Sequence, residues 1–255
     1  MLRKVYNLSK WKFQAMTSKV EMVSVVIPTL NEAGNIREAL ITIEKEVTYP
    51  KEIIVVDGNS TDGTREVVKD INCKLIIEPR RGYGIALRTG IEHAKGDVIV
   101  MVDGDGTYEV RHINRLLDTM IKKNAEMVLA TRMYDPNKAM GMMNFVANKV
   151  MTFFYDLLFA QYLSDTQSGF RAISRPAFEK VKLKEDDMSF ATEMLVGFAK
   201  EGFKMVEVPT VYKSRKYGKT KLRKIKSGVE IFTTMFRGFM ERKYIWKRLR
   251  TVPEA

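Results

Sequence analysis

Short apolar runs alternate along this chain with segments of helical periodicity, and this alternation constrains the fold more than any other feature. The runs are apolar throughout, which is typical of strands buried on both faces of a parallel sheet. Five of them lie in the first half of the chain, at Val23–Pro28, Glu52–Asp57, Lys74–Glu78, Asp97–Asp103 and Glu126–Thr131. Helices are expected between them, at Ala33–Glu46, Asp62–Lys69, Gly82–Ala94 and Arg111–Lys123. The sequence therefore predicts an α/β fold with a doubly wound, mostly parallel sheet flanked by helices.

The second half of the chain departs from this alternation. A helical region rich in methionine and aromatic residues reaches Leu163, and its side chains suit either an adaptable core or a lipid chain. Further elements are expected after the polar segment 164–170, namely helices at Arg175–Val181 and Phe190–Glu201, a strand at Lys204–Val208, and a helix from Leu222. We therefore expect an N-terminal arm at 1–21, a main domain at 22–222 and a basic amphipathic helical tail at 223–255.

The net charge of +12 is concentrated near the end of the chain. Between Lys213 and Arg250 there are fourteen basic residues against two acidic ones, which equals the whole excess. Phe232, Phe236 and Trp246 are interleaved with these charges. A basic amphipathic helix with aromatic residues is typical of a membrane interface, and a helix packed on the main domain has the same pattern. The charge predicts an anionic partner, which could be nucleic acid, anionic lipid or a phosphorylated substrate.

No transmembrane helix is expected, because no stretch reaches the roughly 18 uninterrupted apolar residues that a membrane span requires. Residues 1–20 are basic but lack the apolar core of a signal peptide. The single cysteine, Cys73, excludes an internal disulfide and fits a reducing compartment. These features predict a cytoplasmic protein.

Two carboxylates, Asp103 and Asp105, follow the fourth apolar run and are separated by one glycine. Ligands of open α/β sheets bind beyond the carboxyl ends of the strands, so both side chains are expected at a binding site. Mg²⁺ is typically bound through one or two carboxylates together with substrate phosphates. The triplet is suited to a metal-diphosphate site, although Asp and Gly are also common in plain turns.

Polar residues also follow the first two strands. Asn31 and Glu32 come after the first, and Asp57 ends the second. These short side chains are suited to bind a ribose and a base. Ser60 and Asp62 are suited either to the same task or to capping the next helix. Asp57 is placed too early for a cap, since that helix begins five residues later.

Two common nucleotide-binding motifs are missing from the sequence. No G-x-G-x-x-G follows a strand, and no G-x-x-x-x-G-K-[ST] occurs, which argues against NAD and ATP enzymes. The segment Arg80–Gly84 precedes a helix and is suited either to an anion or to a tight turn.

Five motifs occur in an order that resembles a known family. They are Pro28–Glu32, Asp57 with Ser60–Thr64, Asp103–Asp105, Asp165–Phe170 and the basic Arg215–Leu222. Together they resemble the family 2 glycosyltransferases of GT-A fold, and within these the dolichyl-phosphate mannose synthases and related polyprenyl-phosphate glycosyltransferases. The resemblance extends from about Val23 to Leu222.

The resemblance implies a role for each matching residue. Asp103 and Asp105 would hold the diphosphate and a Mg²⁺ or Mn²⁺ ion, with Asp105 on the metal, while Arg132 would face the acceptor phosphate. Arg215, counted with these three as catalytic, and Lys221 would close over the donor diphosphate. The nucleotide pocket would be lined by Pro28, Leu30, Glu32, Val56 and Asp57. The implied reaction is an inverting transfer of a hexosyl group from a nucleotide sugar to dolichyl or polyprenyl phosphate.

Three departures from the family pattern affect these assignments. Gly58 stands where mannose synthases usually have a second Asp, and Thr107 stands where they have a Gln, so Thr107 becomes the expected third metal ligand. A basic residue expected near Met140 is replaced, which leaves Asn144 or Asn148 as the nearest polar candidates; with Gln167 and Arg132, Asn144 is assigned to the acceptor. GDP-mannose is the first expectation for the donor, with UDP-glucose or UDP-N-acetylglucosamine as alternatives.

Two other functions fit the sequence less well. A sugar-1-phosphate nucleotidyltransferase would need a glycine-rich N-terminal loop with a basic residue, which the chain lacks. A nucleic-acid-binding module would explain the basic tail but none of the five motifs. The expected partners are therefore a nucleotide sugar, a polyprenyl phosphate, and a membrane surface or membrane-protein partner, without nucleic acid. The expected location is peripheral, at the cytoplasmic, inner face of the membrane.

Overall fold

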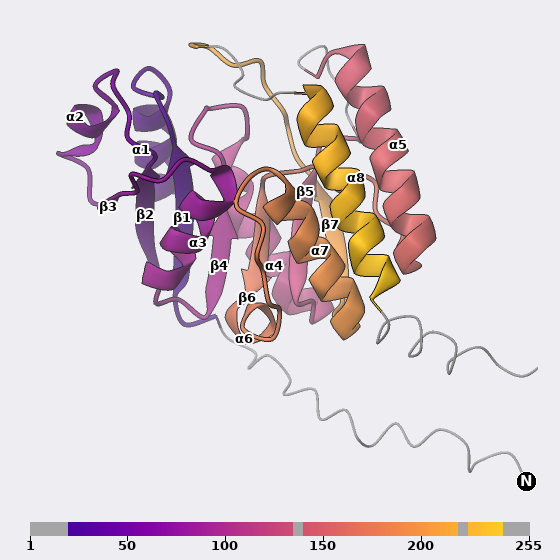
Figure 1. The fold of residues 1–255 in the computed structure, drawn as a ribbon. Coiled ribbons are helices and arrows are strands. Elements are labelled where there is room, and N and C mark those ends of the chain that lie inside the picture. Colours follow the sequence, from indigo (N-terminus) through magenta and orange to yellow (C-terminus); the bar gives the residue numbers. More distant parts are fainter. Residues whose placement is uncertain (1–19, 135–139, 219–223, 242–255) are drawn as a thin grey trace, which may run out of the picture.

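The computed structural model describes residues 20–134, 140–218 and 224–241, with side chains of the last range described from residue 227. Nearly all of the expected N-terminal arm lies outside these residues, as do Lys221 and the tail beyond residue 241. The described part forms one sheet with helices on both faces (Figure 1).

The sheet has seven strands within the described residues, in the order β3-β2-β1-β4-β6-β5-β7. Their bounds are β1 (Val23–Thr29), β2 (Lys51–Asp57), β3 (Lys74–Ile77), β4 (Val98–Met101), β5 (Met127–Thr131), β6 (Arg171–Ser174) and β7 (Met205–Pro209). Neighbouring strands pair in parallel except where β6 lies between β4 and β5, to both of which it is antiparallel. The expected mostly parallel sheet is confirmed.

Strand β6 was not expected from the sequence. It has only four residues and begins with Arg171, so it lacks the long apolar run that marks the other central strands. The Arg171 side chain is nevertheless fully buried, and its guanidinium donates to the carbonyl oxygens of Ser168 and Ala191 at 2.6 and 2.7 Å. Backbone acceptors thus make a buried cation tolerable inside a strand.

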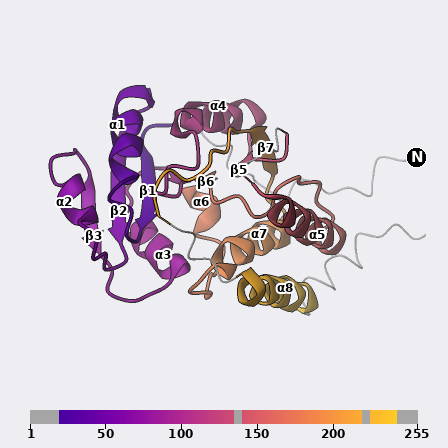
Figure 2. The same cartoon turned by 90° about the horizontal axis from the view of Figure 1, so that it is seen from above.

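Helices cover both faces of the sheet, so that the molecule has three layers (Figure 2). Alternate residues of β1 serve the two cores, with Val25 and Ile27 in one and Val26 in the other. The first core is closed by α1 (Ile36–Glu46), α2 (Thr64–Val68), the 3₁₀ turn η2 (Val110–His112) and α4 (Ile113–Lys123). The second is closed by α3 (Tyr83–His93), α5 (Met142–Phe159), α6 (Arg175–Phe178), α7 (Ser189–Glu201) and α8 (Lys224–Met240).

Helices α5 and α8 lie side by side at one end of the sheet (Figures 1 and 2). Phe154 of α5 meets Phe232 of α8 with ring centroids 5.5 Å apart, and Phe159 meets Phe239 at 6.4 Å. Met235 of α8 is fully buried in the second core. The first helix of the expected tail therefore packs on the main domain, and it still presents an exposed face.

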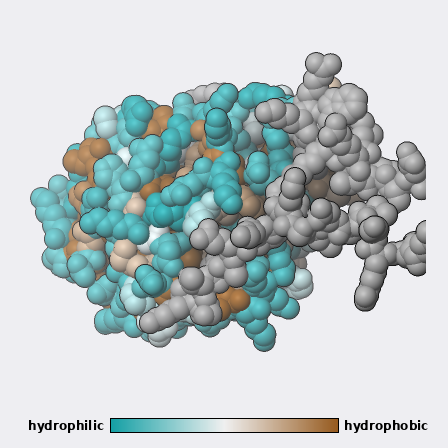
Figure 3. Space-filling view, turned by 90° about the horizontal axis from the view of Figure 1, so that it is seen from below, coloured by the Kyte–Doolittle hydropathy of each residue, from teal (hydrophilic) through white to brown (hydrophobic). Residues whose placement is uncertain are grey.

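No helix in the described ranges is both long enough and apolar enough to cross a membrane. The carboxyl ends of β1, β2 and β4 point to the upper end of the molecule in Figure 1, where the loops that follow them gather. Figure 3 shows the opposite end, where hydrophilic residues predominate. Because predicted site residues such as Asp57, Asp103 and Asp105 end or follow these strands, they lie at the upper end of the molecule.

Candidate active site

The loops after β1 and β2 are joined by hydrogen bonds between their side chains and backbones. Three consecutive amides of the first loop each donate to a side chain of the second: Asn31 to Ser60 at 2.8 Å, Glu32 to Thr64 at 2.9 Å and Ala33 to Asp62 at 3.0 Å. In return the Thr61 amide donates to the Asn31 side chain at 2.8 Å. We call this arrangement the loop clasp. It fixes the two loops as one unit.

The clasp also shows which backbone groups Ser60 and Asp62 contact. Helix α2 has Gly63 as its N-cap residue, with φ of 88° and no capping side chain. Asp62 instead accepts from the amides of Ala33 and Thr64. Ser60 therefore binds the backbone of the first loop, and Asp62 binds both that loop and the first amide of α2.

Asp57 is fully buried at the end of β2. One of its oxygens, Oδ2, accepts from Arg65 Nε at 2.6 Å and from the Ser60 amide at 3.1 Å. The other, Oδ1, is buried and has no hydrogen-bond partner within the described residues. Because an unsatisfied buried acceptor is costly, this oxygen is suited to receive an N–H group from a ligand.

The remaining predicted donor-binding residues lie at different depths. Pro28 and Leu30 are half-buried around the end of β1. Val56 is fully buried and packs in the second core against α3, where only 3.0 Å separates its side chain from a Cβ built on Gly90. Glu32 is buried and accepts from Asn35 Nδ2 at 2.8 Å. Pro28, Leu30 and Glu32 are thus at the strand end, whereas the Val56 side chain faces the core.

Asp103 lies beyond the end of β4, where its Oδ1 accepts from the Tyr83 hydroxyl at 2.8 Å. Gly169 passes so close that a Cβ at this position would lie 2.7 Å from Asp103 Oδ2. Loss of hydration and the nearby Asp105 charge raise the pKa of Asp103 to about 6. A cation bound here would offset both effects and favour the carboxylate.

Asp105 uses both of its oxygens. Oδ1 accepts from the Thr107 amide at 3.0 Å and from the Thr107 hydroxyl at 2.6 Å. Oδ2 lies 2.9 Å from Arg215 Nη2, and the same nitrogen lies 3.0 Å from Glu32 Oε1. The structure thus brings together Glu32, Asp105 and Arg215.

These residues fit a hard divalent cation. Two carboxylates from separate loops, Glu32 and Asp105, already converge on one cationic nitrogen, Arg215 Nη2. The described residues contain no group of three or more His, Cys, Asp or Glu side chains that could hold a metal. A Mg²⁺ or Mn²⁺ ion would therefore depend on oxygen ligands from the donor phosphates, as is usual for Mg²⁺ sites.

Arg132 follows β5 and is paired with Asp165 of the loop before β6. Arg132 Nε and Nη2 lie 2.7 and 2.8 Å from the two carboxylate oxygens, and Asn148 Nδ2 donates to the same carboxylate at 2.6 Å. Burial opposes ionisation of Asp165, but the Arg132 guanidinium outweighs it and lowers the pKa of this carboxyl. This pairing fixes the plane of the guanidinium and leaves Nη1 without a hydrogen bond to the described residues.

The other predicted acceptor residues are less closely connected. Gln167 is half-buried in the same loop as Asp165, and its Nε2 donates to Thr166 Oγ1 at 3.0 Å. Asn144 is exposed in the first turn of α5 and makes no described hydrogen bond to another candidate residue. Asn148, not Asn144, is the α5 side chain that contacts the Arg132–Asp165 pair.

Two contributors to this region were missed in the sequence. In the sequence Tyr83 belongs to Arg80–Gly84, the segment suited to an anion or a tight turn, but in the structure its hydroxyl donates to Asp103. Glu207 of β7 accepts from the amides of Ser164 and Asp165 at 2.7 and 2.9 Å and so positions the loop that carries Asp165. Glu207 could have been noticed in the sequence, because a carboxylate inside an expected strand is unusual.

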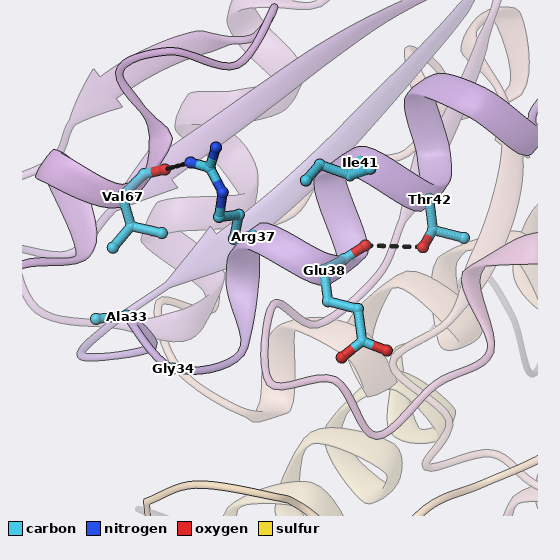
Figure 4. A pocket seen from close by; sticks show the side chains of 7 residues that line it. All are labelled: Ala33, Gly34, Arg37, Glu38, Ile41, Thr42 and Val67. Carbon is cyan, nitrogen blue, oxygen red and sulfur yellow. Dashed lines mark hydrogen bonds between the residues drawn. The ribbon is translucent and has the colours of Figure 1, made fainter.

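A groove of about 520 Å³ lies on the outer side of α1 (Figure 4). Arg37 lines it and donates to the Val67 carbonyl oxygen at 2.9 Å, and Glu38, Ile41 and Gly34 line the remainder. None of the predicted site residues that the structure describes lines this groove. The candidate site is therefore defined by converging side chains rather than by this groove.

Comparison with known proteins identifies the family of this chain. The family described as "Glycosyl transferase family 2" matches residues 24–182. Glycosyltransferase AglJ of Haloferax volcanii is 34% identical over 220 residues, which cover 85% of this chain and 72% of that protein. The dolichyl-phosphate hexose transferase of the same organism is 27% identical over 221 residues, covering 87% of this chain and 95% of that protein.

A solved structure shows the same fold at lower identity. The glucosyl-3-phosphoglycerate synthase of Mycobacterium tuberculosis, crystallised with Mn²⁺, uridine diphosphate and phosphoglyceric acid, superposes with a TM-score of 0.69 at 19% identity. The superposition covers 86% of this chain and 79% of that one. The GT-A type of fold is thereby confirmed, and with the family match over residues 24–182 it follows that this chain belongs to the family 2 glycosyltransferases.

Proposed function

We propose that this enzyme transfers a hexosyl group, with inversion, from a nucleotide sugar to dolichyl or another polyprenyl phosphate. GDP-mannose is the first candidate donor, and UDP-glucose and UDP-N-acetylglucosamine are the alternatives. The observation that carries the choice of a lipid acceptor is an exposed apolar face on α5 and α8. The relative named as a dolichyl-phosphate hexose transferase, which aligns over 95% of its length, supports the same acceptor class.

The apolar face consists of large side chains that point away from the core. It contains Met143, Val146, Val150, Phe153 and Leu157 of α5, and Val229, Phe232, Phe236 and Met240 of α8, with exposed fractions between 39% and 76%. Exposed apolar patches of this kind commonly mark protein or membrane contacts. Lys149 and Arg237 lie on the same helices and are exposed, which suits an anionic lipid surface. We infer that the enzyme is peripheral at the cytoplasmic face of a membrane.

The chemistry follows from the charges at the site. The acceptor phosphate is already an anion, so attack on the sugar needs no strong general base. Negative charge accumulates on the departing nucleoside diphosphate, and Arg215 with Lys221 would stabilise it there. A divalent cation at Asp103 and Asp105 would supply Lewis-acid stabilisation to the same diphosphate. Arg132, held in a fixed plane by Asp165, would orient the acceptor phosphate through its Nη1 group.

The donor can be identified by thermal shift. Purified protein would be melted with GDP or UDP, each alone and with Mg²⁺ or Mn²⁺. A ligand that binds only the folded state raises the melting temperature by mass action. We expect one base to stabilise the protein more than the other, and only with a metal ion.

The acceptor needs a transfer assay. Labelled nucleotide sugar of the preferred base would be incubated with dolichyl or polyprenyl phosphate in vesicles, and the lipid fraction would be counted. The control acceptor is the same lipid without its phosphate. Label in the lipid fraction only with the phosphorylated acceptor is expected, and equal transfer to both lipids, or to neither, contradicts the proposal.

A further inference from the structure

Residues 212–218, which we call the strap, follow β7 and cross the candidate site. Tyr212 forms a β-bridge with Tyr108, and the Lys213 amide donates to the Thr107 carbonyl oxygen at 2.7 Å. Further along, Lys216 lies 2.7 Å from Glu38, and the Tyr217 carbonyl accepts from Asn35 Nδ2 at 3.1 Å. The strap is thus fastened on both sides of Arg215.

Arg215 lies at the point where Glu32 and Asp105 converge. Its Nη2 atom is 3.0 Å from Glu32 Oε1 and 2.9 Å from Asp105 Oδ2. The second Asp105 oxygen is engaged by Thr107. Both oxygens of Asp105 are therefore engaged by groups of the protein itself.

A guanidinium and a divalent cation cannot share this position. Both are positive, and at the same carboxylate oxygen they would repel each other strongly in a partly buried site. The Arg215 side chain is only 20% exposed and Glu32 only 7%, so solvent screens the contact poorly. Binding of a metal at Asp105 Oδ2 therefore requires that Arg215 moves.

We propose that Arg215 is a resident counter-cation, which neutralises Glu32 and Asp105 and occupies Asp105 Oδ2 while the donor and its metal ion are absent. When a nucleoside diphosphate binds together with its metal ion, Arg215 leaves the two carboxylates and binds the diphosphate instead. The free enzyme thus disfavours metal alone and accepts metal together with donor. This inference rests on the proposed metal-dependent function.

Gly34 offers a way to test the strap without changing any charge. A Cβ on Gly34 would lie 2.9 Å from Tyr217 Cγ, closer than real Cβ contacts come, and 3.1 Å from Tyr217 Cβ, which is a tight contact. Atoms so near the backbone cannot swing away, so Gly34→Ala displaces the strap itself. The variant retains Arg215, Glu32 and Asp105.

The experiment is a Mn²⁺ titration of the full chain followed by electron paramagnetic resonance, without nucleotide. Arg215→Gln is expected to bind Mn²⁺ about tenfold more tightly than the wild type, since one charge-assisted contact no longer competes. Gly34→Ala should tighten binding in the same direction. Lys216→Gln removes an equal charge from the strap, but Lys216 pairs with Glu38 and not with Asp105. The Mn²⁺ affinity of this variant should therefore stay within about twofold of the wild type.

The titration is then repeated with saturating GDP and with UDP. With the preferred nucleotide the order should reverse, so that wild type binds Mn²⁺ more tightly than Arg215→Gln, because Arg215 now binds the diphosphate. Equal affinities of Arg215→Gln and Lys216→Gln without nucleotide, or an unchanged affinity in Gly34→Ala, overturn the exchange while leaving metal-dependent transfer intact. Absence of Mn²⁺ binding under every condition contradicts the proposed metal dependence and the exchange with it.

Discussion

At the residue scale, the candidate site depends on a few charged side chains whose partners are far apart in the sequence. Asp105 meets Arg215, 110 positions later, and Arg132 meets Asp165, 33 positions later. Each pairing sets a different expectation. In the proposed mechanism Asp105 acts on the reaction, whereas Asp165 holds Arg132 through hydrogen bonds.

Substitution of Asp105 by Asn should reduce transfer by at least about 100-fold, because an amide binds a divalent cation far less well than a carboxylate. The metal-dependent rise in melting temperature with nucleotide should disappear as well. The nucleotide-free melting temperature should change little. Transfer at the wild-type rate by this variant in chelator-treated buffer contradicts the proposed mechanism.

Substitution of Asp165 by Asn should lower the free energy of unfolding by about 3 kcal/mol, because Arg132 becomes a buried cation without a counter-charge. Its side chain is only 11% exposed. Asp70→Asn is a matched control, since it breaks a pair with Arg37 whose side chains are 63% and 46% exposed. That control should leave the free energy of unfolding nearly unchanged, because solvent screens an exposed pair. Equal losses in urea unfolding would refute the buried-pair argument.

At the element scale, the end of α5 carries a carboxylate in an unfavourable place. Asp156 accepts from the Leu163 amide at 3.1 Å. Burial raises the pKa of Asp156 from 3.8 to about 6. The folded state therefore favours the protonated form, so the stabilising contribution is complete below pH 3.8 and is lost as the pH rises through about 6.

Asp156→Asn should therefore stabilise the protein at pH 8, by about 1 kcal/mol once solvent screening is allowed for. The amide oxygen can still accept from Leu163, so the turn is retained. Near pH 4 the gain should vanish, because the wild-type carboxyl is then protonated in the folded state. Melting curves at the two pH values measure this. An equal gain at both would show that charge is not the cause.

The sequence anticipated the fold to different degrees in different elements. Strands such as β2 and β5 were predicted because buried parallel strands are apolar along their whole length. Strand β6 was missed because its buried Arg171 is stabilised by carbonyl groups that only the folded chain brings together. The positions of Asp57, Asp103 and Asp105 at the carboxyl edge of the sheet were predictable from the sequence, because each follows or ends an apolar strand. The loop clasp and the contacts of Arg215 were not predictable, because they depend on distances between distant loops.

At the scale of the whole molecule, the candidate site and the apolar face of α5 and α8 are parts of the same folded unit. The candidate site residues follow the carboxyl ends of the strands, while α5 and α8 lie at one end of the sheet (Figure 2). Asn148 connects the two regions, because it lies on α5 and donates to Asp165. Attachment through α5 and α8 would therefore bring the acceptor phosphate towards Arg132.

The double variant Leu157→Glu and Phe236→Glu should lose most binding to anionic vesicles in a sedimentation assay, since two apolar contacts become repelled charges. Transfer to a long-chain acceptor should fall in parallel, with the nucleotide-dependent thermal shift unchanged. Ile77→Glu is the control, because this 54% exposed apolar residue belongs to β3 at the other end of the sheet. Vesicle binding equal to that of the control would mean that the apolar face meets a protein partner instead.

The loop clasp has a consequence for anyone who wishes to alter the donor. The amides of Asn31, Glu32 and Ala33 are each satisfied by a side chain of the neighbouring loop. A chimera that takes only the β1–α1 loop from a relative places that loop's amides against side chains it did not evolve with. A chimera that takes only the β2–α2 loop replaces the side chains that accept from these amides. The two loops, 28–35 and 57–64, therefore form one structural unit, and if they bind the donor as proposed, an exchange of donor preference between relatives would require that both are moved together.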